Sequence, residues 1–176
     1  MKRIVILPNE IADTLYRLTS LSDEFSGSLL YRQQGNLCLV ETLFGTGSGN
    51  EGGVETDRRE DEILNTFFRE FPDYKSIDVH THTEETVRTY GEKYSWNFSQ
   101  GDATTMEAKL RENLDYMAML VTPDTRILMG RDDPVLRVED YRDFKMYEKL
   151  VNSLYTNEIT KYRLIDKLRA SSTKYL

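Results

Sequence analysis

The chain has 176 residues, of which 39% are hydrophobic and 30% charged, as expected for one soluble globular domain with a proper core. Its net charge of −7 disfavours a nucleic-acid partner held through phosphates. No apolar run approaches the roughly 20 residues that span a bilayer, and the run near the N-terminus is too short for a signal peptide. We therefore expect a cytoplasmic protein with no membrane partner.

The first part of the chain alternates between strand and helix signals. An apolar run predicts a strand over residues 2–7, and helical spacing of apolar residues predicts a helix over 8–21. Two further strands are expected over 24–44, joined by a hairpin turn at 34–36. Cys38, the single cysteine, lies in the second of these strands and cannot form an internal disulfide. We expect it to be a buried strand residue and not a nucleophile.

A glycine-rich segment follows. Residues 45–57 hold five of the ten glycines, which predicts a mobile loop. The segment lacks the G-x-x-x-x-G-K-[ST] pattern and carries acidic residues, which disfavours a phosphate-binding loop. Asp57 is a suitable N-cap for the next helix, whose apolar stripe runs to Phe71, and Pro72 lies just past its end.

The second half of the chain continues the alternation. A strand is expected over residues 76–82, then a polar insert over 83–98 that forms a loop or short helix. A helix begins at 99 and carries an apolar stripe to 114. A second hairpin is expected over 116–129, and helices over about 139–170. This order predicts an α/β fold, a single domain with a mixed β-sheet and helices packed around it.

The candidate chemistry lies near the middle of the chain. His80 and His82, the only histidines, are two residues apart on a predicted strand, so both side chains point to one face. Asp102, at the start of the next helix, can supply a third ligand. Two nitrogen ligands, one oxygen ligand and a position left for water are typical of a catalytic zinc site. The alternative is a solvated strand end without metal, and Asp78 on the same face is a supporting or surface residue.

The pattern Asp-x-His-x-His also occurs in the barrels of metal-dependent amidohydrolases and PHP-type phosphoesterases. Those folds place the motif near the N-terminus, use further histidines downstream and need roughly 200 or more residues of barrel. Here the motif is in mid-chain and no histidine follows it. This interpretation is therefore rejected.

Over residues 1–130 the sequence resembles the JAMM (JAB/MPN) metalloprotease family. The family's parts occur in order: Glu24 in E-x-x-G-x-L-L, His80 and His82 in His-x-His, and Ser99 and Asp102 in Ser-x-x-Asp. Two departures stand out. Thr83 follows the second histidine where the family usually has proline, and the gap from His82 to Ser99 is longer than usual.

The resemblance implies an MPN fold of the cytidine-deaminase-like type, formed by residues 1–130, with residues 131–176 as a helical extension packed on the same domain. It also implies one zinc ion held by the two histidines and Asp102. Glu24 would act as the general base, and the Ser99 hydroxyl would donate to the oxyanion. Before this comparison Glu24 alone would be taken for a solvated residue at a strand edge.

The implied activity is hydrolysis of a peptide or isopeptide bond after the C-terminal tail of a ubiquitin-like protein, which is the expected partner, free or as a conjugate. A non-catalytic MPN scaffold and a small-amide hydrolase are the alternatives. The glycine-rich loop and the insert 83–98 could clamp the tail, or the insert's aromatic residues could cover the edge of the fold. Residues 161–176 carry a net charge of +4, a solvated helix end or a docking surface for an acidic partner. The oligomeric state is left open.

Overall fold

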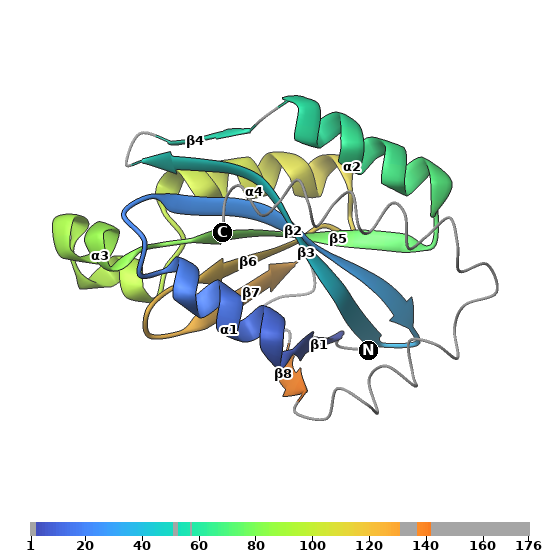
Figure 1. Cartoon of the computed structure of the whole chain (residues 1–176), viewed down its shortest axis with the longest axis horizontal. Coiled ribbons are helices and arrows are strands. Elements are labelled where there is room, and N and C mark those ends of the chain that lie inside the picture. The colour runs from blue at the N-terminus through green and yellow to red at the C-terminus, as the bar shows by residue number, and fades with distance from the viewer. Residues whose placement is uncertain (1–2, 51–52, 57, 131–136, 142–176) are drawn as a thin grey trace.

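A computed structural model describes residues 3–50, 53–56, 58–130 and 137–141 of the chain (Figure 1). No helix among these residues is long and apolar enough to cross a membrane. The helices and strands are, in order, β1 (Ile4–Pro8), α1 (Asn9–Leu18), β2 (Glu24–Gln34), β3 (Leu37–Asn50), β4 (Gly53–Thr56), α2 (Arg58–Glu70), β5 (Tyr74–Thr81), α3 (Glu84–Tyr90), the 3₁₀ helix η1 (Glu92–Ser95), α4 (Gln100–Glu112), β6 (Met117–Val121), β7 (Arg126–Gly130) and β8 (Arg137–Tyr141).

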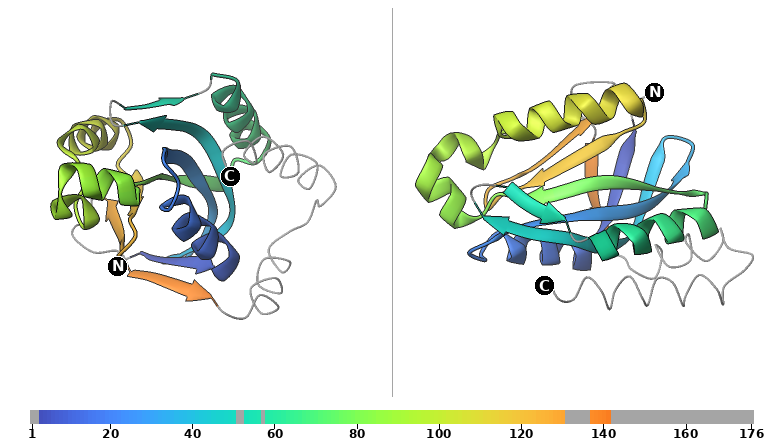
Figure 2. Two further views of the ribbon diagram at one scale, coloured as in Figure 1. Left: turned by 60° about the vertical axis from the view of Figure 1, so that its left-hand side comes forward. Right: turned by 90° about the horizontal axis from the view of Figure 1, so that it is seen from above.

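The eight strands of the described residues form one mixed sheet. Seven of them have the order β7-β6-β5-β2-β3-β1-β8, and β4 pairs with β3. The pairings β1–β3, β1–β8 and β5–β6 are parallel, and the others are antiparallel. The sheet curves around α1, while α2 and α4 lie on its other face (Figures 1 and 2). The expected α/β fold with a mixed sheet is confirmed.

The face of the sheet under α1 is apolar, as the alternation along β5 predicts. Ile77 and Val79 are 0% and 1% exposed and belong to one core cluster with Leu15 of α1. Burying each such side chain stabilises the fold by about 1.5–3 kcal/mol. Because successive strand residues point to opposite faces, Asp78 and His80 face the side of the sheet that carries α2 and α4.

A smaller core cluster holds α2 on that second face. Phe67 is fully buried, and its ring packs edge-on against Tyr74, with 4.9 Å between centroids. The helix ends at Glu70, two residues before Pro72, as the sequence predicts. Asp57, the expected N-cap, lies outside the described residues.

The expectation of a mobile loop over residues 45–57 is wrong. The described residues of this segment belong to β3 and β4, which pair antiparallel with Gly47 opposite Thr56. On its other side β3 pairs with β2, with Gly27 opposite Gly45. Glycine weakens an isolated strand, but here neighbouring strands on both sides bond to the backbone, and the missing side chains let the strands approach closely.

Gly27 is the glycine for which the fold leaves no room for a side chain. A Cβ there would lie 2.5 Å from the Phe44 carbonyl oxygen and 2.8 Å from the Phe25 ring. We expect Gly27→Ala to lower the free energy of unfolding by about 1–3 kcal/mol or more, measured in urea. The control is Gly101→Ala in α4, where a Cβ meets Ser99 Oγ at 3.7 Å. That change should stabilise the helix by up to about 1 kcal/mol, and equal unfolding midpoints for the two variants would contradict the prediction.

The expectation of helices over about 139–170 is wrong at its beginning. Arg137–Tyr141 forms β8, which pairs parallel to β1 with Ile4 opposite Arg137. Pairing with the outer edge of β1 overrides the helical periodicity there. Residues 142–176, including the basic stretch, lie outside the described residues. The sheet therefore extends past residue 130, and the packing of a helical extension stays a prediction.

Cys38 lies on β3 with none of its surface exposed, and its thiol is free. Burial raises the pKa of this thiol to about 11, so little thiolate is present near neutral pH. Since the thiolate is the nucleophilic form, a structural role is the better interpretation of this residue.

Candidate metal centre

The two histidines reach the pocket face from the end of β5. His80 lies in mid-sheet, opposite Ser26 of β2 and Leu120 of β6. His82 follows the last strand residue, and its backbone N–H donates to the Val121 carbonyl at 2.9 Å, which continues the pairing with β6. The ring centroids are 5.4 Å apart, so the sheet places both imidazoles side by side as the sequence predicts.

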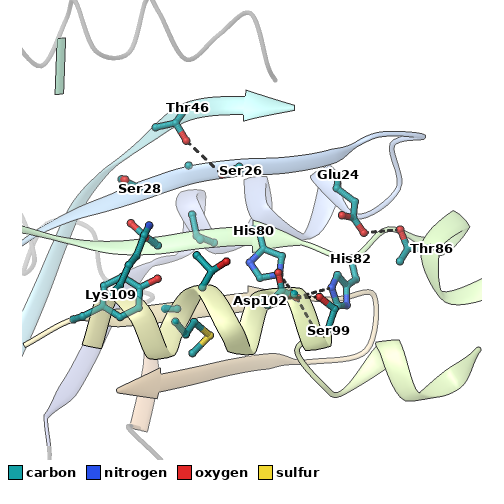
Figure 3. Close-up of a pocket in the computed structure, with 18 of the residues that line it drawn as sticks. Glu24, Ser26, Ser28, Thr46, His80, His82, Thr86, Ser99, Asp102 and Lys109 are labelled. Atoms are coloured by element: carbon teal, nitrogen blue, oxygen red, sulfur yellow. Dashed lines mark hydrogen bonds and ion pairs between the residues drawn. The ribbon is translucent and has the colours of Figure 1, made fainter. Parts of the chain in front are cut away.

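Asp102 faces the histidines from the first turn of α4. Ser99 caps this helix: its hydroxyl accepts the Asp102 N–H at 3.1 Å, and Oδ2 of Asp102 accepts the Ser99 N–H at 2.7 Å. The same Oδ2 lies 3.3 Å from Nε2 of His80 and 3.6 Å from Nε2 of His82 (Figure 3). One ligand atom from each of the three residues lies within 4.8 Å of the others.

The hydrogen bonding of the imidazoles fits a metal ion. Nδ1 of His82 lies 2.9 Å from the Tyr94 carbonyl, which can only accept, so Nδ1 carries the proton and Nε2 is left with a lone pair. Nε2 of His80 is buried, and its contact with Oδ2 of Asp102 at 3.3 Å is not aligned as a good hydrogen bond. Two imidazole nitrogens and a carboxylate turned toward one point are a donor set that suits zinc, and the Tyr94 carbonyl is the usual kind of support for a ligating imidazole.

The electrostatics of the cluster favour a positive charge at its centre. Burial alone would raise the pKa of Asp102, but hydrogen bonding to the two histidines outweighs it and holds this pKa well below its usual range. Burial likewise lowers the pKa of His82, but Asp102 and the Tyr94 carbonyl more than compensate and raise it. Both shifts have one cause, because the negative Asp102 carboxylate and a protonated imidazole stabilise each other.

Glu24 begins β2 and belongs to the same pocket, but it lies outside the three-residue cluster. Its Oε1 accepts a hydrogen bond of 2.8 Å from the Thr86 hydroxyl. Ser26 lies opposite His80 in the antiparallel pair of β2 and β5. Glu24 precedes Ser26 by two residues on β2 and therefore lies toward the His82 end of the site. Figure 3 shows its carboxylate beside Thr86, on the side of the pocket where His82 lies. A carboxylate placed there can exchange protons with a bound molecule without holding the metal.

A pocket of about 740 Å³ joins these groups. The sheet face of β2 and β5 forms its floor, and α2 and α4 line its sides. The residues that carry the predicted chemistry all line it: Glu24, His80, His82, Ser99 and Asp102. The structure thus brings together every site residue that the sequence predicts. Ser99 serves as helix cap, and its hydroxyl hydrogen is not needed for that contact.

The departure at Thr83 has a local cause. Thr83 is the N-cap of α3, its hydroxyl accepts the Thr86 N–H at 3.1 Å, and it is fully buried. Proline has no hydroxyl for this cap. The longer gap to Ser99 accommodates α3 and η1, and the Thr122 hydroxyl ties η1 down by donating to the Ser95 carbonyl at 2.7 Å.

The aromatic residues of the insert 83–98 differ in their surroundings, and their expected roles, clamping a tail or covering the edge of the fold, stay predictions. Tyr94 is half-buried, with its ring 5.5 Å from that of His82, so it packs beside the candidate metal centre. Tyr90 and Trp96 are 40% and 51% exposed. Tyr90 lines the pocket beside Tyr94, where it is available for contact with a bound molecule.

Among the pocket residues that sequence reasoning did not assign to the site are Thr86, Lys109 and Tyr116. Nothing in the sequence links Thr86 with Glu24, which lies 62 positions away. Lys109 carries a usable signal, because it follows Asp102 by two helical turns and so points to the same side of the helix. Tyr116 lines the pocket from the segment just before β6.

Comparison with known proteins finds a protein of similar fold but gives no information on function. No family model matches the chain, and no curated protein matches it. Among solved structures, the chain is similar to the solution structure of protein DSY2949 from Desulfitobacterium hafniense. The similarity has a TM-score of 0.53 at 14% identity and covers 80% of this chain and 94% of that one. The chain therefore shares its fold with a bacterial protein whose structure is known.

Proposed function

We propose that the chain is a zinc-dependent hydrolase of the JAMM type, acting in the cytoplasm on a peptide or isopeptide bond at the tail of a ubiquitin-like protein. The observation that carries the proposal is the convergence of His80, His82 and Asp102 on one point, with Glu24 in the same pocket. A non-catalytic scaffold of this fold would not need both the three metal ligands and the carboxylate of a general base.

The metal would be held by the two imidazoles and Asp102. When bound, zinc would lower the pKa of a water molecule from 15.7 to about 7 and polarise the carbonyl of the scissile bond. Glu24 would accept a proton from the attacking water at its carboxylate and deliver it to the leaving amine. The Thr86 hydroxyl orients this carboxylate by donating to Oε1. The Ser99 hydroxyl would donate to the oxygen on which negative charge develops.

Two features of the pocket bear on the substrate. Its volume of about 740 Å³ is within the range of small-molecule sites, which favours a small-amide hydrolase as the second candidate. Its floor is a sheet face that extends on both sides of His80, which suits an extended peptide segment. Comparing a ubiquitin-like conjugate, a short peptide amide and a small amide as substrates separates these candidates.

Metal content is the first test of the proposal. Protein purified without added metal should contain zinc near one equivalent, measured by elemental analysis. Replacing both histidines by alanine should remove the metal, because a single carboxylate cannot hold zinc. The control is Asp13→Asn, an exposed carboxylate on α1, which should leave the zinc content unchanged. Zinc that persists in the double histidine variant would contradict the assignment.

A further inference from the structure

The helix that supplies Asp102 is weakly attached by apolar contacts. The sequence predicts an apolar stripe of Ala103, Met106, Leu110 and Leu114 on one side of this helix, and Met106 is the one buried residue of α4. Ala103 is exposed, Leu110 is half-buried, and Leu114, beyond the helix end, is 55% exposed. The stripe therefore contributes little apolar packing to the attachment of α4. Polar contacts add to this attachment.

One such contact lies at the far end of the pocket. Nζ of Lys109 is 2.5 Å from Oδ2 of Asp78. Asp78 precedes His80 by two residues on β5, a distance of about 7 Å along a strand. Lys109 follows Asp102 by seven residues on α4, about 10 Å along a helix. The ion pair therefore joins the same two elements that carry the metal ligands, at a second point.

Tyr116 completes this contact from a third segment. Its ring centroid lies 5.4 Å from Nζ of Lys109, within the range of a cation–π contact. Burial and the nearby Asp78 carboxylate raise the pKa of Tyr116 above its usual value, so its hydroxyl stays neutral. The ammonium group thus has a carboxylate as one partner and an aromatic face as another.

The position of the pair indicates its role. Lys109 is the one lysine or arginine among the described residues that line the pocket, and Asp78 neutralises it, which disfavours the capture of a substrate anion. The pair is also partly exposed, with side chains 48% and 33% accessible, so it adds little to global stability. The pair does connect α4 with β5, because its two side chains come from these two elements.

We propose that Asp78 and Lys109 form a clamp that positions α4, and through it Asp102, for metal binding. Met106, the buried residue of the helix, lies between Asp102 and Lys109, four residues from one and three from the other. A tilt of α4 about Met106 displaces both ends by similar amounts, so holding Lys109 also holds Asp102. The link to the metal depends on the proposed zinc site, whereas the attachment of α4 does not.

The experiment compares Lys109→Met with two matched variants. Lys109→Met keeps the length of the side chain and removes the charge, and Lys109→Arg keeps the charge. Arg111→Met removes a cation from the exposed side of the same helix, where Arg111 pairs with Glu107 at 4.0 Å. Hydrogen exchange of the α4 amides is measured in the metal-free protein. Zinc affinity is measured by competition with a chelator, and the absorption bands of bound Co²⁺ report the geometry of the site.

We expect Lys109→Met to speed hydrogen exchange of the α4 amides and to change the absorption bands of bound Co²⁺. It should also weaken zinc binding about tenfold, which is the lower end of the usual effect of residues that support metal ligands. Arg111→Met and Lys109→Arg should resemble the unaltered protein in all three measurements. Asp78→Asn should repeat the effect of Lys109→Met.

The variants and measurements distinguish the ways in which the proposal could be wrong. Unchanged exchange in α4 would overturn the clamp, and so would a Lys109→Arg variant as weak as Lys109→Met. Faster exchange with unchanged zinc affinity would overturn the link between the clamp and the metal. If the unaltered protein binds no zinc, the proposed function and that link fail together, while hydrogen exchange still decides whether the ion pair holds the helix.

Discussion

Glu24→Gln is expected to abolish nearly all hydrolysis while the protein keeps its fold and its zinc. The amide has the size of the carboxylate, and its oxygen can still accept the hydrogen bond from Thr86. However, it cannot take a proton from water at neutral pH. Loss of a general base lowers the rate typically by 10²–10⁴. The measurements are kcat on a cleaved substrate and zinc content on the same sample.

Glu10→Gln is a suitable control, because Glu10 is an exposed carboxylate in the first turn of α1. It should retain full activity. Activity of Glu24→Gln within about tenfold of that of the unaltered protein would mean that another group is the base. Loss of zinc from the same variant would instead make Glu24 a ligand and would contradict its place outside the cluster.

Ser99→Ala should lower kcat by roughly 10²–10³ with little change in KM, because an oxyanion donor acts mainly in the transition state. Ser99 also caps α4, and the loss of a cap costs about 1 kcal/mol of stability when alanine replaces serine. Activity measured on the alanine variant alone would therefore mix two effects.

Ser99→Gly separates them. Glycine is nearly as good an N-cap as serine, within a few tenths of a kcal/mol, but it offers no donor. If the hydroxyl stabilises the oxyanion, both variants should lose kcat equally, while only Ser99→Ala is less stable in urea. A glycine variant that keeps its kcat would show that Ser99 acts only by starting the helix that carries Asp102.

The elements that carry the ligands were the most predictable part of the chain. The alternation of Ile77 and Val79 with Asp78 and His80 defines both the strand and the face that each side chain occupies, because a strand repeats every two residues. The start of α4 was equally predictable from the sequence, because Ser99 caps the helix by a local hydrogen bond that depends on few residues.

What the sequence could not reveal depends on neighbours distant in the chain. The glycines of 45–57 have low strand propensity, and only pairing with β2 and β4 makes them a strand. The strand at 137–141 likewise depends on the free edge of β1. The apolar residues of α4 have helical spacing, but spacing does not reveal whether the facing surface is a core or a pocket.

In the candidate site, too, local features were predictable from the sequence and contacts between distant segments were not. His80 and His82 were predictable because they are the only histidines and lie at the end of a recognisable strand, and Asp102 because it follows a recognisable helix cap. The partner of Glu24 was not, since Thr86 belongs to the insert and meets Glu24 only through the packing of α3. The Asp78–Lys109 pair likewise required the angle between a strand and a helix, which periodicity does not give.

The position of β1 also affects how the chain folds during synthesis. β1 lies between β3 and β8: β3 follows it within the first 50 residues, whereas β8 is the last strand of the described chain. At about 5–20 residues per second, ribosomes need on the order of ten seconds or more to reach Tyr141. Until then the outer edge of β1 has no strand beside it, and an open edge invites pairing with other chains. Until β8 is made, the outer edge of β1 is therefore a place where the nascent protein can pair with another chain.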